Sequence, residues 1–401
     1  MKTSLFLFVL FFSISGLADD VEKYQDWKDR PSEEFTNAAS NFKLVMDKLL
    51  ERYIDKKITP DDLYRAATAG MLESLNSNAE DWNKLMAPQE VKELEIDLTG
   101  KVTGIGIEMK FDDHLGYGHV LSLIPNSPAE KAGLKVDDQI LSVEGKKFKG
   151  KQFRDLIYAI RGQVGKSVKL KILREDEILT INIKREVIPW TPVEFQKIDK
   201  ATALLTIGYF TEETPKLVEK EILEINRQNI TKLIIDLRGN SGGGFDQAVK
   251  TAELFVPNGA TIVATRDRSG KVEKYDSSRG LLNKDLQIAI VTNKGTSSGA
   301  ELFAAALREN WNVKVIGETT FGKWNAQTID KLPNKFAIKY TVKEFLSPKG
   351  NTFQGIGMKP DLEVDLPKEK NVREMRLKFN ISERLDMDGQ LKAAVELIKS
   401  I

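Results

Sequence analysis

The stretch that decides the fold is KLIIDLRGNSGGGFDQAVKTAELF, residues 232–255. It begins with a short apolar run typical of a buried strand, passes through a glycine-rich turn and ends with helical periodicity. The same alternation continues on both sides. Strand patterns recur at ATALLTIGY (201–209), QIAIVTN (287–293) and VKVIGE (313–318), and helical patterns at PKLVEKEILEINRQ (215–228) and GAELFAAALREN (299–310). Strands separated by helices of this length predict an α/β domain with a mainly parallel sheet covered on both faces.

This core is expected over residues 188–366, after a break at Pro189–Pro192, with further strands at 336–345 and 360–366. Upstream, residues 19–95 have a helical pattern with a cap signal at Thr59–Asp62. Residues 96–187 contain five or six short strands and two helical stretches, which predicts a small, partly open β-barrel. Residues 367–401 end in an amphipathic helix, GQLKAAVELIKS (389–400), which we expect to pack on the core or on a second subunit.

The charge balance argues against a nucleic-acid-binding protein. The 401 residues include 60 lysines and arginines against 59 aspartates and glutamates, and the basic residues are scattered. Nucleic-acid binders concentrate basic residues in a patch or stripe. A protein or peptide substrate is therefore expected.

The first twenty residues, MKTSLFLFVLFFSISGLADD, predict a cleavable secretory signal over residues 1–18. Lys2 precedes an apolar run from Leu5 to Phe12, and small residues stand before Asp19. The alternative is a membrane anchor, but the run is shorter than the roughly 20 apolar residues that cross a bilayer. We expect an exported protein, most consistent with a bacterial periplasm.

The chain has no cysteine, which excludes thiol nucleophiles, disulfides and thiolate metal sites. Its two histidines, His114 and His119, lie in one short segment. Catalytic groups elsewhere in the chain must therefore work without imidazole.

Two sequence segments indicate a peptide-binding module within residues 96–187. TGIGIEMK (103–110) is followed by VLSLIPNSPAEKAGLKVDDQILSVEGKKFKG (120–150), and together they resemble a PDZ domain. Gly104, Ile105, Gly106 and Ile107 stand where such domains place the loop that binds a terminal carboxylate. Glycines leave backbone N–H groups exposed to a carboxylate, and an adjacent strand edge can pair with an extended tail. PDZ domains also serve as adaptors, so this module alone does not establish an enzyme.

The segment VTNKGTSSGAELFAAAL (291–307) places Ser298 between a predicted strand and a predicted helix. A serine there exposes its hydroxyl at a sharp turn beside a helix N-terminus, which favours developing negative charge. The alternative is a helix cap, because Ser298 and Glu301 have the spacing of a capping box. The two interpretations are compatible.

A serine nucleophile needs a base, and without imidazole the best candidate is a neutral lysine. Lys323 follows an apolar strand and a glycine turn, between Phe321 and Trp324. A neutral lysine near pH 7–8 needs its pKa brought down from about 10.4, at a cost of roughly 3–4 kcal/mol. We therefore expect Lys323 to be buried.

The combined motifs resemble the carboxyl-terminal processing peptidases, or tail-specific proteases. They are DLRGNSGGG (236–244), TSSGAE (296–301), GETTFGK (317–323) and FLSPKGNTFQGIGMKPDLEV (345–364). These peptidases combine a PDZ module with an α/β core related to the Clp-protease and crotonase folds, and they use a Ser–Lys dyad without metal or cofactor.

This resemblance implies that Ser298 is the nucleophile, that Lys323 is the general base and that Gln327 orients the lysine amine. An oxyanion hole would come from the backbone N–H of Gly299 and of a glycine in the Gly242–Gly243 pair. Its partners would be proteins with unstructured apolar C-termini, and an adaptor or activator protein could deliver them. The helical regions at both ends invite homo-oligomerisation.

The sequence departs from the family pattern in several places. Gly299 replaces the usual alanine, Ala300 a common serine, and Trp324 and Asn325 two smaller residues. Trp324 could desolvate Lys323 or narrow the substrate groove. Two alternatives remain open: a catalytically silent tail-binding adaptor, and an acyl-CoA-handling enzyme of the crotonase type.

Overall fold

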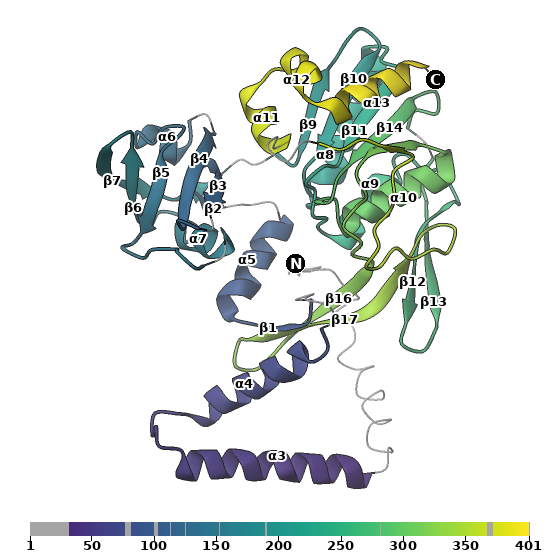
Figure 1. Ribbon diagram of the computed structural model, residues 1–401. Coiled ribbons are helices and arrows are strands. Elements are labelled where there is room, and N and C mark those ends of the chain that lie inside the picture. Colours follow the sequence, from purple (N-terminus) through teal and green to yellow (C-terminus); the bar gives the residue numbers. More distant parts are fainter. Residues whose placement is uncertain are drawn as a thin grey trace, which may run out of the picture. The chain divides into compact units, whose positions relative to one another are not determined.

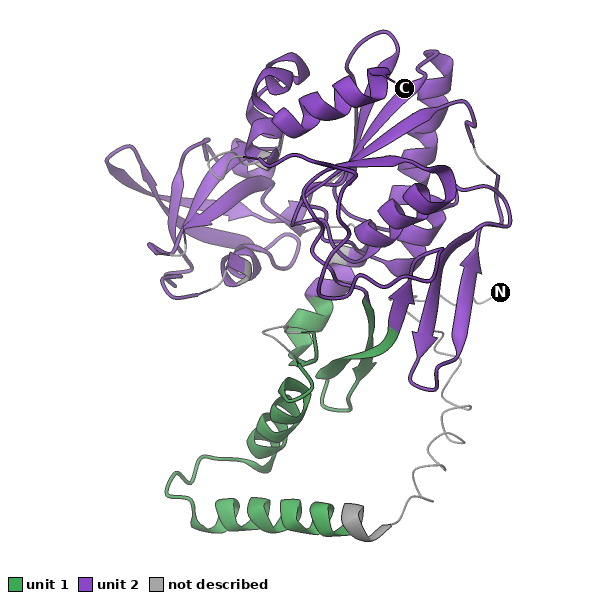
Figure 2. Ribbon diagram, turned by 45° about the vertical axis from the view of Figure 1, so that its right-hand side comes forward, with its two compact units in different colours: residues 1–92, 325–343 green, residues 93–324, 344–401 purple. Residues whose placement is uncertain are grey.

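The computed structural model describes residues 32–76, 82–99, 103–112, 114–124, 126–151, 153–188, 191–280, 282–366 and 372–400. The chain divides into two compact units, residues 1–92 with 325–343 and residues 93–324 with 344–401 (Figure 2). The predicted signal at residues 1–18 lies outside the described residues.

Unit 1 is a helical region closed by a small sheet. Its elements are α3 (Ser32–Arg52), α4 (Pro60–Glu73), β1 (Lys84–Met86), the start of α5 (Pro88–Thr99), β16 (Asn325–Lys331) and most of β17 (Ala337–Leu346). At the start of α4, the Asp62 N–H donates to the Thr59 hydroxyl at 3.2 Å and the Thr59 N–H donates to the Asp62 carboxylate at 3.0 Å. The predicted cap signal therefore forms a capping box.

The expectation of continuous helix up to residue 95 is wrong at β1. Lys84–Met86 pairs antiparallel with β17, whose residues come some 250 positions later in the chain. Local periodicity does not report such a non-local partner, so three residues carry no strand signal of their own.

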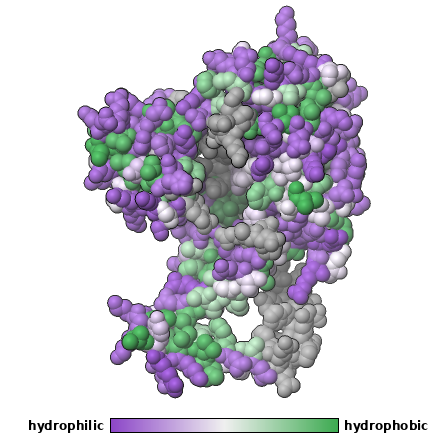
Figure 3. Space-filling model, in the orientation of Figure 1, coloured by the Kyte–Doolittle hydropathy of each residue, from purple (hydrophilic) through white to green (hydrophobic). Residues whose placement is uncertain are grey.

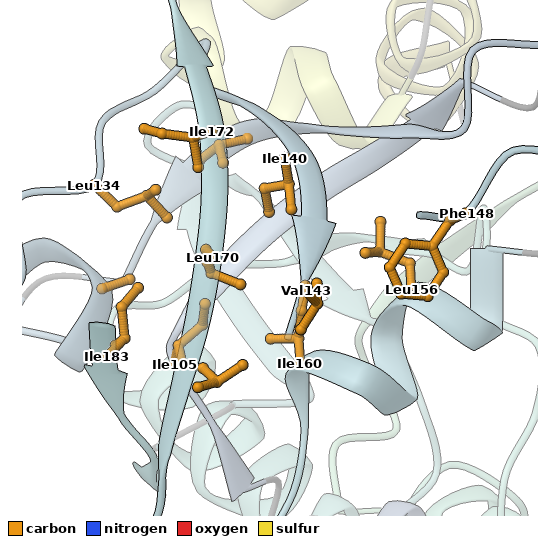
Figure 4. Packing of buried hydrophobic residues seen from close by; sticks show 13 residues of the cluster. Ile105, Leu134, Ile140, Val143, Phe148, Leu156, Ile160, Leu170, Ile172 and Ile183 are labelled. Atoms are coloured by element: carbon orange, nitrogen blue, oxygen red, sulfur yellow. The ribbon is translucent and has the colours of Figure 1, made fainter. Parts of the chain in front are cut away.

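Residues 103–187 fold as the PDZ-like module (Figure 1). Its elements are β2 (Thr103–Gly104), β3 (Ile107–Asp112), β4 (Tyr117–Leu123), α6 (Pro128–Lys131), β5 (Gln139–Val143), α7 (Phe153–Ile160), β6 (Ser167–Arg174), β7 (Glu177–Lys184) and β8 (Glu186–Val187). The main sheet has the order β3-β4-β5-β6-β7 with antiparallel neighbours, and it does not close into a barrel. Figure 4 shows the apolar core, to which Ile105, Leu156 and Leu170 contribute. β3 is left at the edge of the sheet.

The core domain contains the predicted parallel sheet. Its elements are β9 (Val193–Lys197), β10 (Thr202–Ile207), α8 (Thr214–Arg227), β11 (Lys232–Asp236), α9 (Phe245–Ala252), β12 (Thr261–Asp267), β13 (Val272–Asp276), β14 (Gln287–Thr292), α10 (Gly299–Trp311), β15 (Lys314–Gly317), β18 (Leu362–Glu363), α11 (Val372–Lys378), α12 (Ile381–Met387) and α13 (Gly389–Ser400). The sheet order is β18-β15-β14-β11-β10-β9, and every pair is parallel except β10 with β9. The predicted α/β fold class is confirmed.

The final helix packs on this sheet. Leu391, Ala394 and Ile398 of α13 share one buried cluster with Leu204 of β10 and Ile234 of β11. Alternate strand residues face opposite sides of a sheet, so α13 covers one face and the neighbouring strand positions point to the other. We expected α13 to pack on the core or on a second subunit, and in this structure it packs on the core of its own chain.

A buried ion network joins the C-terminal helices to the loop that follows β11. The Arg238 guanidinium donates to both carboxylate oxygens of Asp236 and of Asp388, at 2.8–2.9 Å. All three side chains are fully buried. Burial alone would raise the pKa of Asp236, but the charge of Arg238 and its hydrogen bonds outweigh burial and hold that pKa below its usual range.

Replacing Asp388 with alanine should lower the free energy of unfolding by about 3 kcal/mol, because a buried guanidinium then loses one of its two carboxylates. Denaturant titration monitored by circular dichroism measures the change. Asp386→Ala is the control, since Asp386 is an exposed residue of α12, two positions before Asp388, and should change stability by less than about 0.5 kcal/mol. Equal losses in both variants would show that the pair does not hold the segment.

Candidate active site

Three sequence motifs, DLRGNSGGG (236–244), TSSGAE (296–301) and GETTFGK (317–323), meet at one edge of the parallel sheet. The carboxyl end of β11 leads into DLRGNSGGG, that of β14 into the loop before Ser298, and that of β15 into the loop that carries Lys323. In open α/β sheets, sites form outside the carboxyl ends of the strands. The topology therefore brings the nucleophile, base and oxyanion candidates to the same edge.

Ser298 occupies a strained turn immediately before α10. Its backbone angles are φ 54° and ψ −123°, and it is partly exposed. Few non-glycine residues adopt positive φ, and such strain occurs at nucleophile turns between a strand and a helix. The turn therefore presents the hydroxyl at the helix N-terminus, where developing negative charge is stabilised.

The helix-cap interpretation of Ser298 is compatible with this role. The Glu301 carboxylate accepts the Ser298 N–H at 2.8 Å. The Glu301 N–H lies 2.8 Å from the carbonyl oxygen of Ser298, so it has an acceptor other than the hydroxyl. The serine is thus held through its backbone.

Glu301 also binds the loop that carries Lys323. Its Oε2 accepts the N–H of Lys323 at 2.8 Å, and this is the same oxygen that accepts the Ser298 N–H. Its Oε1 accepts the Gly322 N–H at 2.8 Å and the Thr320 hydroxyl at 2.5 Å. Because both N–H groups bond the same oxygen atom, the backbone nitrogens of Ser298 and Lys323 can lie no farther apart than twice 2.8 Å.

The Glu301 side chain is fully buried. Burial raises the pKa of its carboxyl group, and the hydrogen bonds from Thr320, Gly322, Lys323 and Ser298 act in the opposite direction. A carboxylate in this position needs all of these donors, because a buried charge without partners is costly.

Lys323 is half-buried, less than the full burial that we expected for a neutral lysine. Trp324, in contrast, is fully buried and packs edge-on against Phe353, with ring centroids 4.9 Å apart. The backbone N–H of Trp324 donates to the Gln354 side-chain oxygen at 2.7 Å, and its backbone carbonyl accepts the Phe345 N–H at 2.7 Å. The indole is a core side chain, so it does not project into a surface groove.

Gln327 lies in β16 of unit 1, whereas Ser298 and Lys323 belong to unit 2. Its amide donates to the Asn325 carbonyl at 3.0 Å and to the Thr341 hydroxyl at 3.3 Å, both in its own unit. The predicted role of Gln327 in orienting the lysine stays a prediction.

The glycine loop after β11 reaches the serine closely. A side-chain Cβ at Gly242 would lie 2.9 Å from the Ser298 Cβ and 3.0 Å from the Gly299 nitrogen. The Gly242 N–H is already donated to the Asn240 side chain at 2.8 Å. Because the Gly242 N–H already has this acceptor, the N–H groups of Gly243 and Gly299 remain the candidate donors of the predicted oxyanion hole.

Sequence reasoning missed Glu301 and Asn240 as supports of the site. Asn240 is fully buried, donates to the Ile207 carbonyl at 2.8 Å and accepts the Gly242 N–H, while its own carbonyl accepts the Ser297 N–H at 2.9 Å. Both residues stand inside the quoted motifs, DLRGNSGGG and TSSGAE. The sequence gives no indication that an amide and a carboxylate there hold backbone groups of other loops.

A groove of about 450 Å³ runs along the edge of the PDZ-like module. Its lining includes all of residues 103–109, the α7 side chains Phe153, Ile157 and Ile160, and also Tyr209 and Ser241 of the core. The predicted carboxylate-binding residues Gly104, Ile105, Gly106 and Ile107 therefore all line one groove beside the edge strand β3. The Ile105 side chain itself is buried, so this residue can offer a ligand only its backbone.

The described residues contain no group of three or more histidine, aspartate or glutamate side chains placed to hold a metal ion. Over the same residues, no helix has both the length and the apolar character that crossing a membrane requires.

Gly242→Ala should destabilise the protein more than the matched variant Gly259→Ala. Both glycines have positive φ, but a Cβ at Gly259 meets nothing within 4 Å, whereas one at Gly242 overlaps the serine turn. We expect about 1–2 kcal/mol for the backbone strain alone and roughly 1–3 kcal/mol more at Gly242. Denaturant unfolding of the two variants measures the difference; equal losses would mean that the loop and the turn are not in close contact.

Glu301→Gln should lower the free energy of unfolding by about 1–3 kcal/mol. An amide nitrogen cannot accept the two donors that each carboxylate oxygen accepts, so two of them lose their partner. The control is Glu396→Gln, the same substitution on an exposed position of α13. A Glu301→Gln variant as stable as this control would contradict the arrangement.

Comparison with known proteins supports these motifs independently. Residues 201–364 match Peptidase family S41, and residues 119–174 match the PDZ domain family. A probable CtpA-like serine protease from Staphylococcus aureus (strain bovine RF122 / ET3-1) is 33% identical over 328 residues, which is 81% of this chain and 64% of the relative. A Staphylococcus epidermidis protein of the same description is 33% identical over 319 residues. The chain thus spans somewhat less than two thirds of these curated relatives.

Two solved structures share the fold. The photosystem II D1 C-terminal processing protease aligns with a TM-score of 0.53 and 25% identity, covering 81% of this chain and 86% of that one. A putative S41 protease from Bacteroides fragilis aligns with a TM-score of 0.57 and 16% identity, covering 89% and 97%. These matches support the resemblance inferred from the motifs: residues 201–364 match peptidase family S41, and residues 119–174, which precede them, match a PDZ domain.

Proposed function

We propose that this protein is a serine endopeptidase that cleaves other proteins after binding their unstructured, apolar C-terminal tails. The observation that carries the proposal is the Glu301 carboxylate, which holds the backbones of Ser298 and Lys323 on one oxygen atom. It gives a serine in a strained, helix-facing turn a lysine neighbour, which is the arrangement a Ser–Lys dyad needs. The match of residues 201–364 to a peptidase family favours this over the crotonase-type alternative.

The proposed reaction passes through an acyl-enzyme. Neutral Lys323 accepts the proton of the Ser298 hydroxyl as the oxygen attacks the scissile carbonyl, and the resulting oxyanion is stabilised by the N–H groups of Gly243 and Gly299. The protonated lysine then gives its proton to the leaving amine as the C–N bond breaks. Water, deprotonated by the same lysine, hydrolyses the ester and restores the serine. Gln327 would orient the lysine amine.

The PDZ groove provides the means of choosing substrates. A tail that adds a strand to the open edge of β3 would place its terminal carboxylate at the backbone of residues 104–107, with its last side chain against Ile157 and Ile160. Backbone pairing is tolerant of sequence, while the apolar lining favours apolar ends. The substrate class is therefore defined by its C-terminus.

Export and self-association are further parts of the proposal. The predicted signal at residues 1–18 directs the chain out of the cytoplasm, to the periplasm if the source is a bacterium with two membranes.

Large apolar side chains are exposed on α3 and just after it, and Figure 3 shows hydrophobic surface gathered there: Phe42, Leu44, Val45, Leu49, Leu50, Tyr53 and Ile54. An exposed apolar patch of this kind supports a homo-oligomer or docking of an adaptor or activator protein.

Purified protein should cleave an unfolded model substrate that ends in an apolar tail, and Ser298→Ala should abolish the cleavage. Lys323→Ala should lower kcat by about 10²–10⁴, because the general base is lost. The matched control is Lys294→Ala, which removes an exposed lysine four residues before the serine. Mass spectrometry of the products measures each rate and locates the cut.

Two results would contradict the peptidase proposal. Cleavage that persists in Ser298→Ala would assign it to another group or to a contaminant. Tail binding without cleavage, in the presence of a correctly folded site, would favour the silent adaptor or an enzyme that awaits an activator.

Tail capture has its own test. Amidating the C-terminus of a tail peptide removes the charge that residues 104–107 are proposed to bind, so affinity should fall at least tenfold in fluorescence anisotropy. An internal peptide of identical composition serves as the control. Equal binding of the free acid and the amide would show that the groove does not read a carboxylate.

A further inference from the structure

We propose that Phe321 and Ile356 form an apolar subsite at the catalytic edge, which holds a large apolar substrate side chain next to the scissile bond. This inference rests on the proposed peptidase function and adds a second selection step to it. The PDZ groove would choose the tail, and this pair would choose where the chain is cut.

Phe321 is fixed beside the nucleophile through its backbone. Its N–H donates to the carbonyl of Thr296, two residues before Ser298, at 2.9 Å. The next residue, Gly322, donates to the Glu301 carboxylate that also holds the serine. The ring nevertheless remains 51% exposed.

Ile356 belongs to a loop that is hydrogen-bonded to the same segment. The Gly355 N–H donates to the Gly322 carbonyl at 2.8 Å, and the Met358 N–H donates to the Thr320 hydroxyl at 2.7 Å. A Cβ at Gly322 would lie 3.0 Å from the Ile356 nitrogen, so the two backbones are in close contact. The Ile356 side chain is 70% exposed.

The apolar residues of these two segments divide into two groups. Trp324 and Met358 are buried, with exposed fractions of 0% and 1%, and they pack the loops onto the core. Phe321 and Ile356, in contrast, keep half or more of their surface exposed. Single exposed apolar residues are common on protein surfaces, but here two large ones stand on segments whose backbones are in contact at Gly322, directly before the proposed base.

The chemistry of this pair defines the ligand. A phenyl ring and a branched aliphatic chain offer no hydrogen bond or charge, so they favour leucine-, methionine- or phenylalanine-sized side chains over polar ones. Filling or emptying such a contact typically changes kcat/KM by about 10- to 200-fold. The backbone hydrogen bonds keep both residues in place before substrate arrives, so little ordering is needed on binding.

The test uses peptides with one fixed apolar tail and a single varied position near the cut, leucine in one series and serine in the other. In the wild type the leucine series should be cleaved with the higher kcat/KM. In Phe321→Ala and Ile356→Ala the leucine-to-serine ratio should fall about tenfold each, and Phe321→Leu should restore much of it. Val272→Ala changes an apolar residue of β13 that is 48% exposed, and it should leave the ratio unchanged.

The outcomes separate the subsite from the proposed function. Variants that cleave both series more slowly but keep the wild-type ratio would overturn the subsite while leaving the peptidase in place. No Ser298-dependent cleavage by the wild type would refute the proposed function and the subsite with it. Unchanged thermal unfolding of the variants excludes misfolding as the cause of a changed ratio.

Discussion

The arrangement of this site depends on one buried carboxylate. Glu301 sits on the first turn of α10 and accepts four donors: the backbone N–H groups of Ser298, Gly322 and Lys323 and the hydroxyl of Thr320. It belongs to the helix that follows the serine and binds the loop that carries the lysine. Two segments about 25 residues apart in sequence are thereby held at a fixed separation, and the strained turn at Ser298 is held by the same group.

The remaining supports act on the other side of the serine. Asn240 uses its side-chain amide and its carbonyl to join the glycine loop to the ends of β10 and of the serine loop. Two residues before Asn240, Arg238 is bound by Asp236 and by Asp388 of the C-terminal segment. The last helices of the chain thus stabilise the loop from which an oxyanion donor is expected, which gives them a structural link to the site even though they lie far from it in sequence.

Much of this could be predicted from the sequence, for identifiable reasons. Buried strands such as KLIID and helices such as α13 have strong local periodicity, and the glycines at 242 and 243 stand in a motif whose backbone must approach another group closely. β1, β16 and the β12–β13 hairpin were not predicted, because short or half-exposed strands are defined by their partners more than by their own pattern. Trp324 was expected beside the base or in a groove, and it is instead a core residue. The capping-box spacing indicates the bond between Glu301 and Ser298, but it does not indicate the other three donors, because these come from a loop some 20 residues away.

The most direct test of the central claim is the pH dependence of Ser298 phosphonylation by a fluorophosphonate, in which the serine oxygen displaces fluoride from phosphorus, followed by intact mass and peptide mapping in the wild type and in Lys323→Ala. If neutral Lys323 activates the serine, the wild type forms a single adduct on Ser298 with a rate that rises as the lysine loses its proton. The variant should then react at least 100-fold more slowly. Equal rates in the two proteins, or an adduct on a different residue, would contradict the proposed dyad.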